Sequence, residues 1–485
     1  MKINIPLILL TLTVAFAVNV VSAAPGDMIY VNDSSGNDFN DGFSWEFAKK
    51  TIKSATGSVN SNGTVNIAKG YYKGVGNNNI IIHKNMTING ESKEGTIIDG
   101  TNNARIFIIN DVNVIIYNLT IINGNATDSR GGAIYNDGFI TLKECNFISN
   151  SAYLSGGAIF NNGVCIVDDG LFANNSVVIN CGSAIFNKGT CIVNGSIFIN
   201  NTSTVSGGAI TNDYANCTVT GSIFTGNRAS YGGAIYNYYG NCTLSSSTFT
   251  NNKASIDGGA FGNRHGNSAI TGCNFENNTA ANGGAISNYF GNSILCYSRI
   301  IGNNAAQGSA IFSSNGQVDA RYNWWGLNSG PAIEKLVGEI NYYPWLVLSI
   351  KTNPSSIREG KTATITADVY NDCAGGDHSN DWPLFFSDVS VKFTTNRGQI
   401  GSKEISVVMS FGKAIATLRA SSGAGLYILT VTLDGQRVDK SLNVSQAKLY
   451  ALNHTIKMQK TGLPINYLIF ALFMVISGFL LPKRK

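Results

Sequence analysis

The feature that most constrains the fold of this chain is a tetrapeptide, Gly131-Gly-Ala-Ile134, that recurs seven more times with little change. Each copy begins 25 or 26 residues after the previous one. A phenylalanine recurs at the same interval, beginning at Phe147, and an asparagine follows it three residues later, beginning at Asn150. Two markers that keep step over eight units predict a repeat architecture rather than a single globular core.

Both markers continue through the later repeats. The tetrapeptide begins again at Gly156, Gly182, Gly207, Gly232, Gly258, Gly283 and Gly308. The phenylalanine series continues with Phe172, Phe198, Phe224, Phe249 and Phe275, and Ile301 takes the next place. The asparagine series continues with Asn175, Asn201, Asn227, Asn252, Asn278 and Asn304.

The composition of the unit predicts strands and turns. The chain has 54 glycines and only 13% charged residues, it shows no helical period, and its turns are rich in Gly and Asn, which are poor helix formers. Three short strands per unit, each bonded to the next unit about 4.8 Å away, would make a parallel β-helix. Two residue columns are then expected to face inward, one running from Ile140 through Cys165, Cys191, Cys217 and Cys242, the other from Leu142 through Val167.

The β-helix is predicted to span residues 28–342, with regular rungs over 131–312 and looser ones before them. Apolar residues spaced as on one helix face predict a short capping helix at about 45–55. A second cap is expected over 321–331, where Trp324 and Trp325 would cover the other end or, alternatively, stack against a carbohydrate.

The sequence pattern changes near Leu346, where the repeat ends. Alternating strands separated by glycine predict a β-sandwich over 346–446. The phrases Val391-Lys-Phe-Thr-Thr395 and Ala414-Ile-Ala-Thr-Leu418 resemble bacterial Ig-like domains of the invasin type, which implies a spacer module. The predicted fold class is therefore all-β: a parallel β-helix followed by an Ig-like sandwich.

Both ends of the chain predict export and anchoring. Residues 1–23 have a basic start, an apolar run and small residues before Ala24, which is typical of a signal peptide. After a linker over 447–464, the apolar run 465–481 is about 25 Å long as a helix, enough to cross a membrane. The basic residues of 482–485 predict a cytoplasmic tail. We expect a cell-surface protein held in its own membrane by the C-terminal helix.

Charge argues against nucleic acid as a partner. The formal net charge is +5, but four basic residues lie at the two extreme ends of the chain, so the other 30 face 29 acidic residues. No basic stripe is available to neutralise phosphates.

The search for chemistry finds one carboxylate pair. Glu144 and Asp169 align on neighbouring rungs, near the separation used by a retaining glycosidase. The following rungs place Asn194-Gly195 and Thr220-Gly221 there, so no acidic groove develops, and Lys143 facing Asp168 indicates a surface ion pair. We treat Glu144 and Asp169 as weak catalytic candidates and interpret Arg264-His265-Gly266 as a polar turn.

No cofactor or metal site is predicted, because the chain has no Cys-x-x-Cys motif and its four histidines are scattered. The nine cysteines are expected to be mostly buried free thiols, with a disulfide between stacked rungs as the alternative. Asn-x-Ser/Thr triplets predict candidate N-glycosylation at Asn118, Asn125, Asn174, Asn194, Asn201, Asn216, Asn241 and Asn277.

Several segments carry resemblances to known families. The opening Tyr30-Val-Asn-Asp-Ser-Ser-Gly-Asn-Asp38 resembles the start of pectate-lyase-like right-handed β-helices, and the Gly-Gly-Ala-Ile and Phe-x-x-Asn pairing is similar to repeats of chlamydial polymorphic outer membrane proteins. The whole arrangement most resembles adhesin-like surface proteins of methanogenic archaea. The resemblance implies a right-handed β-helix attached to a cell surface. From the long, flat, regular face of the stacked rungs we expect it to bind glycans or surface proteins of other cells without catalysis. The alternative is an extracellular polysaccharide lyase or glycoside hydrolase on the same fold.

Overall fold

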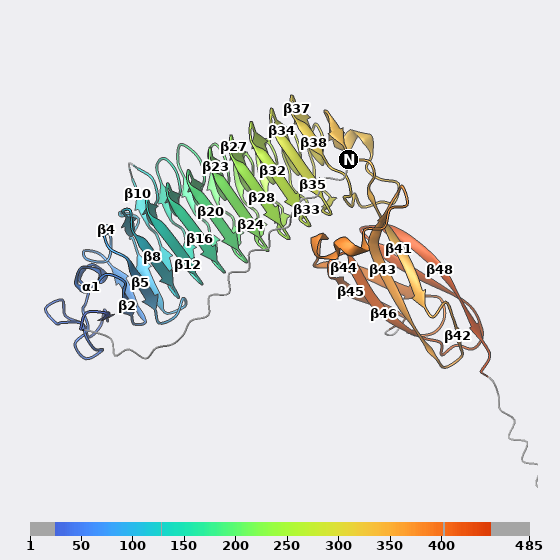
Figure 1. Cartoon of the computed structure of the whole chain (residues 1–485), viewed down its shortest axis with the longest axis horizontal. Helices are drawn as coiled ribbons and strands as arrows, with labels where there is room; N and C mark the ends of the chain where they lie inside the picture. The colour runs from blue at the N-terminus through green and yellow to red at the C-terminus, as the bar shows by residue number, and fades with distance from the viewer. Residues whose placement is uncertain (1–24, 128, 401–402, 448–485) are drawn as a thin grey trace, which may run out of the picture. The chain divides into compact units, whose positions relative to one another are not determined.

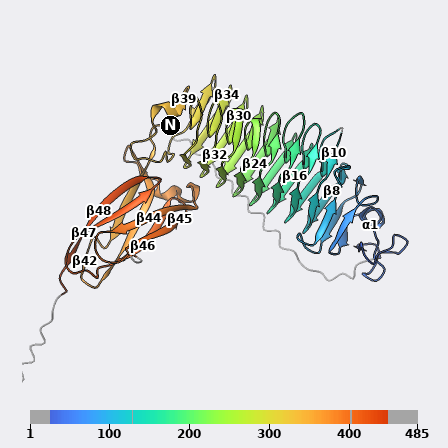
Figure 2. The same ribbon diagram turned by 180° about the vertical axis from the view of Figure 1, so that it is seen from behind.

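The computed structural model describes residues 25–127, 129–400 and 403–447, and nearly all of its regular structure is β-strand. The predicted parallel β-helix is confirmed: four sheets run along one axis, and every strand pair within them is parallel. Figures 1 and 2 show successive strands of each sheet side by side from the blue to the yellow part of the chain.

The largest sheet has thirteen strands. They are β1 (Met28–Val31), β2 (Gly63–Ile67), β5 (Met86–Gly90), β8 (Asn113–Tyr117), β12 (Phe139–Lys143), β16 (Val164–Asp168), β20 (Thr190–Asn194), β24 (Asn216–Thr220), β28 (Asn241–Ser245), β32 (Asn267–Thr271), β35 (Asn292–Cys296), β38 (Gln317–Asp319) and β40 (Ile340–Asn341).

The ten-stranded sheet follows it around each turn of the coil. Its strands are β3 (Gly70–Lys73), β6 (Thr96–Asp99), β9 (Thr120–Ile122), β13 (Asn146–Ile148), β17 (Leu171–Ala173), β21 (Ile197–Ile199), β25 (Ile223–Thr225), β29 (Thr248–Thr250), β33 (Asn274–Glu276) and β36 (Arg299–Ile301).

The remaining two sheets complete each rung. The six-stranded sheet has β10 (Asn125–Ala126), β14 (Ser151–Ala152), β18 (Ser176–Val177), β22 (Thr202–Ser203), β26 (Arg228–Tyr231) and β30 (Lys253–Asp257). The eleven-stranded sheet has β4 (Ile80–Ile82), β7 (Phe107–Ile109), β11 (Ile134–Asn136), β15 (Ile159–Asn161), β19 (Ile185–Asn187), β23 (Ile210–Asp213), β27 (Ile235–Tyr238), β31 (Phe261–Arg264), β34 (Ile286–Tyr289), β37 (Ile311–Ser314) and β39 (Leu336–Val337).

The repeated phenylalanines form one continuous stack inside the β-helix. Neighbouring rings from Phe147 to Phe275 lie 4.7–4.9 Å apart and nearly parallel, and all are buried. The predicted inward columns that begin at Ile140 and Leu142 are buried in the same core. Burial of so much apolar surface in a regular column is the main stabilising contribution to the rungs.

Two ladders of buried asparagines bond the rungs together. In the ladder that follows the phenylalanines, each side-chain amide donates to the side-chain oxygen of the next asparagine, as from Asn175 to Asn201 at 2.9 Å. The second ladder was not predicted: it ends the strands of the eleven-stranded sheet, where Asn161 donates to Asn187 at 2.7 Å. Its members are Asn136, Asn161, Asn187, Asn212, Asn237, Asn263 and Asn288.

The last regular rung corrects the predicted register by one residue. Ile300, not Ile301, pairs with Phe275 and is buried, and Asn303, not Asn304, accepts the hydrogen bonds from Asn278. The predicted interval at this rung is 26 residues, whereas the strands keep an interval of 25.

The N-terminal helix also begins later than predicted. The sequence pattern predicted a helix at about 45–55, but the structure places α1 at Ile52–Ser58. The Thr51 side chain accepts a hydrogen bond from the Ser54 N–H, so Thr51 is the N-cap. The Asp38 carboxylate holds the preceding residues in a non-helical conformation by accepting from the backbone of Lys50 and Thr51.

Residues 346–445 form two further sheets. The three-stranded sheet has β41 (Leu346–Asn353), β43 (Thr362–Asp372) and β46 (Lys413–Arg419). The five-stranded sheet has β42 (Ser356–Arg358), β48 (Gln436–Ser445), β47 (Gly425–Leu433), β44 (Val389–Thr395) and β45 (Glu404–Met409), and its pairs are antiparallel except β42 with β48. Two 3₁₀ turns, η1 (Ile333–Lys335) and η2 (Ser379–Leu384), complete the described elements.

The predicted signal peptide, transmembrane helix and cytoplasmic tail, and nearly all of the linker, lie outside the described residues. Within residues 25–127, 129–400 and 403–447, no helix is long and apolar enough to cross a membrane.

Candidate functional site

The two weak catalytic candidates, Glu144 and Asp169, lie at equivalent corners of successive rungs. Both have a left-handed backbone conformation, with φ of 49° and 54°. The Glu144 carboxylate lies 3.8 Å from Lys93 Nζ, toward the preceding rungs, and the Asp169 carboxylate leans over Gly195 of the following rung. The two acids therefore turn in opposite directions along the axis, and neither lines the β-helix cavities of about 410, 240 and 620 Å³.

The neighbouring pair is held as an ordinary surface interaction. Lys143 Nζ lies 4.0 Å from Asp168 Oδ2, and Asn194 donates to the other oxygen of Asp168 at 2.9 Å. An acid that is already paired and half-exposed has no evident role in proton transfer.

One candidate glycosylation residue is corrected by the structure. Asn201 is fully buried, and its amide nitrogen donates to the carbonyl of Phe172 and to Asn227. That nitrogen is therefore closed to glycan attachment in the folded chain. Asn174, Asn216, Asn241 and Asn277 are exposed and Asn118, Asn125 and Asn194 are half-buried, and these seven stay predictions.

The cysteine column lies in the core, and all nine cysteines of the chain are free. Cys165, Cys191, Cys217 and Cys242 occupy equivalent positions on four successive rungs. Among the described residues, no group of three or more His, Cys, Asp or Glu could hold a metal ion.

Both tryptophans are buried, each in a different hydrophobic core. Trp325 is 1% exposed and belongs to the β-helix core, whereas Trp324 is 0% exposed and belongs to the core of the C-terminal sheets. The indole N–H of Trp324 donates to Asp434 at 2.7 Å. Neither ring is available to stack against a carbohydrate, so that alternative is wrong.

A hollow opens on the outer face of the eleven-stranded sheet, where one column of residues changes character. In this column Tyr135, Phe160 and Phe186 carry stacked rings. Thr211 comes next, and Tyr236 and Phe312 carry rings farther along. Between the last two rings the column holds Gly262 and Ser287. A Cβ at Gly262 would lie 2.9 Å from the Tyr236 ring, so the ring leans over this glycine.

We call the resulting cavity of about 240 Å³ the Tyr236 cavity. Residues of β27, β31 and β34 line it. Figure 1 labels β27 and β34, and β31 lies between them in the eleven-stranded sheet. It is lined by Tyr231, Tyr236, Asp257, Asn263, Arg264, Ser287, Tyr289 and Phe290.

The polar groups of the Tyr236 cavity are of three kinds. Asp257 is only 7% exposed, and its Oδ1 accepts hydrogen bonds from the Tyr289 hydroxyl at 3.1 Å and from Asn282 at 2.9 Å. Burial raises the pKa of Tyr236 to about 12, and burial together with the charge of Asp257 raises the pKa of Tyr289 to about 12. Both phenols therefore stay protonated at neutral pH and can donate hydrogen bonds. Arg264 supplies a guanidinium on an exposed residue.

A ladder of surface rings, exposed except for the half-buried His265, runs beside this cavity. Tyr214, Tyr239, His265 and Phe290 occupy equivalent left-handed turns, and their ring centroids lie 4.4–4.9 Å apart. The segment Arg264-His265-Gly266 is a turn, as interpreted from the sequence, but Arg264 lines the Tyr236 cavity and His265 belongs to the ladder.

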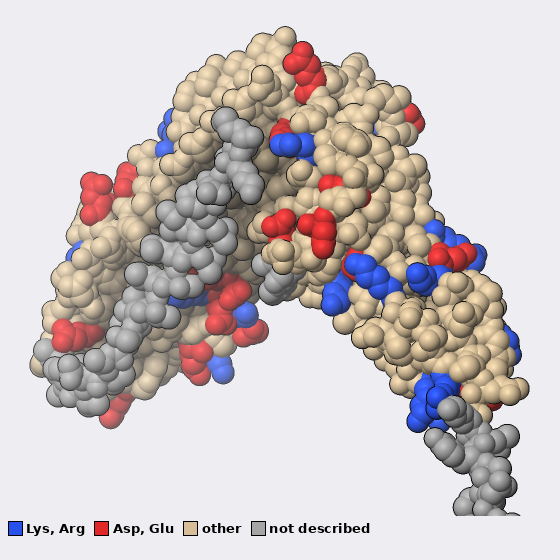
Figure 3. Space-filling view, turned by 45° about the vertical axis from the view of Figure 1, so that its right-hand side comes forward, with Lys and Arg blue, Asp and Glu red and all other residues tan. Residues whose placement is uncertain are grey.

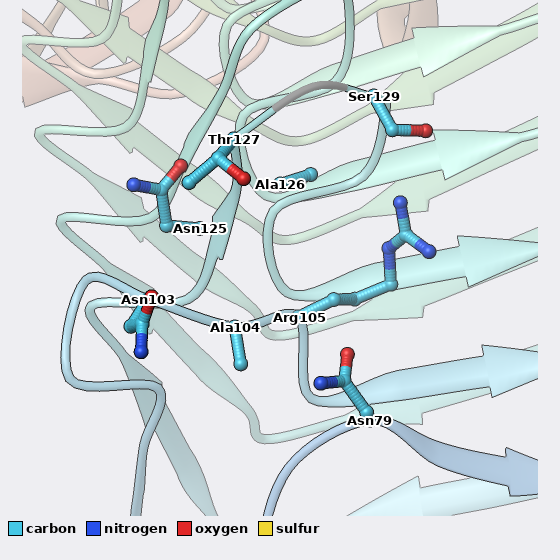
Figure 4. A pocket seen from close by; sticks show the side chains of 8 residues that line it. All are labelled: Asn79, Asn103, Ala104, Arg105, Asn125, Ala126, Thr127 and Ser129. Atoms are coloured by element: carbon cyan, nitrogen blue, oxygen red, sulfur yellow. The ribbon is translucent and has the colours of Figure 1, made fainter.

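A second cavity of about 410 Å³ lies earlier in the β-helix and is polar (Figure 4). Asn79, Arg105 and Ser129 are among its lining residues. Arg105 already donates from Nε to the carbonyl of Gly131 at 2.8 Å and stacks over the Tyr135 ring. Its guanidinium therefore has a structural role.

Charged side chains are sparse on the molecular surface. In Figure 3, the Lys and Arg residues and the Asp and Glu residues form small scattered groups, and most of the face in view is uncharged. The outer positions of the thirteen-stranded sheet are mostly Thr and Ile, as in Thr141, Ile166, Ile192, Thr218, Thr243 and Ile294.

One comparison, with a family of repeats, agrees with the repeat architecture. Residues 195–213 and 221–238 match the Chlamydia polymorphic membrane protein repeat. Among curated proteins no match is found. A solved structure, the native GH136 lacto-N-biosidase from Eubacterium ramulus, aligns with 65% of this chain and 68% of its own, at 12% identity and a TM-score of 0.32. The two matched segments lie within the regular rungs of the β-helix.

Sequence reasoning missed the Tyr236 cavity. Its two charged residues, Asp257 and Arg264, are seven residues apart in one repeat, and no sequence motif links them. The available signal was the position after each Gly-Gly-Ala-Ile segment, where an aromatic residue gives way to Gly262 and Ser287.

Proposed function

We propose that this chain is a non-catalytic, adhesin-like cell-surface protein whose β-helix binds glycans or surface proteins of other cells. The observation that carries the proposal is the match to the Chlamydia polymorphic membrane protein repeat on a chain that folds as a parallel β-helix. Long, uncharged sheet faces and a row of surface rings give such a protein the surface it needs for contact with sugars, since aromatic rings pack well against apolar faces.

The same proposal places the protein at the outside of its own cell. Residues 1–23 would direct export, and 465–481 would hold the chain in the membrane with 482–485 inside. Residues 346–446 would be an Ig-like spacer between the membrane and the β-helix. The resemblance to adhesin-like proteins of methanogenic archaea is part of this proposal. The proposal includes no nucleic-acid partner.

Catalysis is the competing function, as a polysaccharide lyase or glycoside hydrolase. Two acids that act on one bond must face a common substrate, at about 5 Å for retention or about 6.5–9.5 Å for inversion. Glu144 and Asp169 turn away from each other, toward Lys93 and over Gly195. Their geometry therefore favours binding over turnover.

The test uses the purified full chain, presented on vesicles. Saturable binding to glycan-coated beads or to cells, with no release of reducing ends or unsaturated products from pectin, other uronates and host glycans, supports the proposal. Turnover that is abolished by Glu144→Gln would overturn it. The control for a general loss of charge is the Asp41→Asn variant, which changes an exposed loop acid at the N-terminal end of the β-helix.

A further inference from the structure

Two features shape the Tyr236 cavity. The strands of the eleven-stranded sheet beneath it keep their register, from Tyr236 to Gly262 and then to Ser287, so the small residues there come from the sequence. At its edge the pairing of β26 with β30 shifts register, where Tyr231 pairs with Asp257. The backbone offers the same outer position that Phe160 and Phe186 fill in other rungs. Thr211 also stands in this column, but only at Gly262 and Ser287 do two successive small residues follow a ring, and they leave room for one ring-sized group from outside.

The cavity also contains an acceptor that the protein leaves unused. Oδ1 of Asp257 accepts two hydrogen bonds, but Oδ2 accepts none from the described residues, although the residue is more than nine-tenths buried. This oxygen is not fully enclosed by the described residues, so a ligand hydroxyl in the cavity can donate a hydrogen bond to it. Arg264 lines the same cavity and, among residues 25–127, 129–400 and 403–447, makes no ion pair within 4.0 Å.

We propose that the Tyr236 cavity binds one neutral hexose residue of a glycan, with its apolar face on the Tyr236 ring. A hexose matches this chemistry because it has a face of C–H groups and a rim of hydroxyls that both donate and accept. One hydroxyl donates to Asp257 Oδ2, and other hydroxyl oxygens accept from Arg264. The carboxylate and the guanidinium together carry no net charge, so a neutral ligand leaves the site balanced, whereas a sugar acid adds an uncompensated carboxylate.

This inference rests on the proposed function, and it assigns that function to one place. The ladder of surface rings reaches the cavity at Phe290, which belongs to both. A longer glycan whose terminal residue occupies the cavity can therefore continue along rings that are already in line.

The test titrates the purified full chain with the methyl glycosides of D-glucose, D-galactose and D-mannose, with N-acetyl-D-glucosamine, and with D-galacturonic acid, by saturation-transfer NMR. At least one neutral sugar should bind. Ser287→Phe should weaken this binding at least tenfold, because it restores the ring that Phe312 supplies in the next rung. Ser287→Ala, which keeps the hollow, should change it less than twofold.

Two further variants test the polar contacts. Asp257→Asn retains an oxygen for Tyr289 and Asn282 but loses the charge, and it should weaken binding about tenfold. Arg264→Gln should weaken it by several fold, whereas Arg228→Gln, an exposed arginine outside the cavity lining, should have no effect. Circular dichroism of each variant confirms that the β-helix is folded.

Three outcomes would overturn the inference. The first is neutral-sugar binding that Ser287→Phe leaves intact, which retains the proposed function but moves it to another surface. The second is binding of D-galacturonic acid in preference to all neutral sugars. The third is the absence of binding to every sugar while the full chain still adheres to cells, which leaves adhesion without this site.

Discussion

Each asparagine of the buried ladders bonds several groups at once, so these residues matter more than their polarity suggests. The Asn201 oxygen accepts from the backbone and the side chain of Asn175, and its amide donates to Phe172 and Asn227. A buried polar group that loses its partner costs about 1–3 kcal/mol. The sequence triplet that predicts glycosylation is the same whether the side chain faces solvent or the core.

We therefore expect Asn201→Ala to destabilise the chain by about 2–4 kcal/mol, because the Asn175 donors lose their acceptor. Thr202→Ala, at the exposed next residue, should change stability by less than about 0.5 kcal/mol. Urea unfolding followed by circular dichroism compares the two midpoints. Equal midpoints would show that the ladder does not hold the rungs.

Buried thiols predict a loss of stability in alkali. Burial raises the pKa of Cys145 and Cys273 from an ordinary 9.0 to about 12. The unfolded chain releases these protons at lower pH than the folded chain, so stability is unaffected below about pH 9 and falls as the pH rises from 9 toward 12. The urea midpoint at pH 10.5 should lie below that at pH 8. The Cys145→Ala/Cys273→Ala variant should show a smaller difference between the two pH values, and an equal difference would exclude these thiols as the cause.

At the scale of the element, the rungs depend on the interior ring stack. Phe198 lies 4.7 Å from the rings on both sides and is fully buried, whereas its neighbour Ile197 points outward on the same strand. Phe198→Ala should cost about 3–5 kcal/mol by opening a cavity in the stack, and Ile197→Ala should cost less than about 1 kcal/mol. Thermal unfolding of both variants measures the contrast. A larger loss from Ile197→Ala would contradict the assignment of faces.

The repeat period predicts the β-strands well, but it predicts the exact register, the helix start and the cavity less well. The repeat interval was enough to place parallel strands and to identify the inward columns that begin at Ile140 and Leu142. It could not place Ile300 ahead of Ile301, because both are apolar and only the strand pairing selects one. The start of α1 also escaped the apolar pattern, because the cap at Thr51 and the Asp38 hydrogen bonds decide it. The Tyr236 cavity arises because Gly262 and Ser287 have no large side chain. A search of the sequence for reactive residues does not detect a missing side chain.

At the scale of the whole molecule, one ion pair links residues far apart in the sequence. The Arg299 guanidinium donates to Asp434 at 2.6 and 2.8 Å, and its third contact is Glu276 at 2.8 Å. The side chains of Arg299 and Asp434 are both more than nine-tenths buried. Trp324 donates to the same carboxylate, so Asp434 serves two buried donors.

Removing this carboxylate should therefore be severe. Asp434→Ala leaves the Arg299 charge buried with only Glu276 as partner, and we expect a loss of about 3–5 kcal/mol. Asp439→Ala, which breaks an exposed pair with Arg437, should cost less than about 1 kcal/mol. Urea midpoints of the two variants provide the measurement, and a similar loss in both would show that burial of the pair adds nothing.

The uninterrupted asparagine ladders have a consequence for how such a gene can change. Excising codons 207–231 would join Ser206 directly to Gly232 and bring Asn201 against Asn252, so the same bonds re-form one step shorter. Duplication of that segment would lengthen the coil by about 4.8 Å in the same way. Unequal recombination can therefore adjust the length of the β-helix without requiring a single new kind of contact.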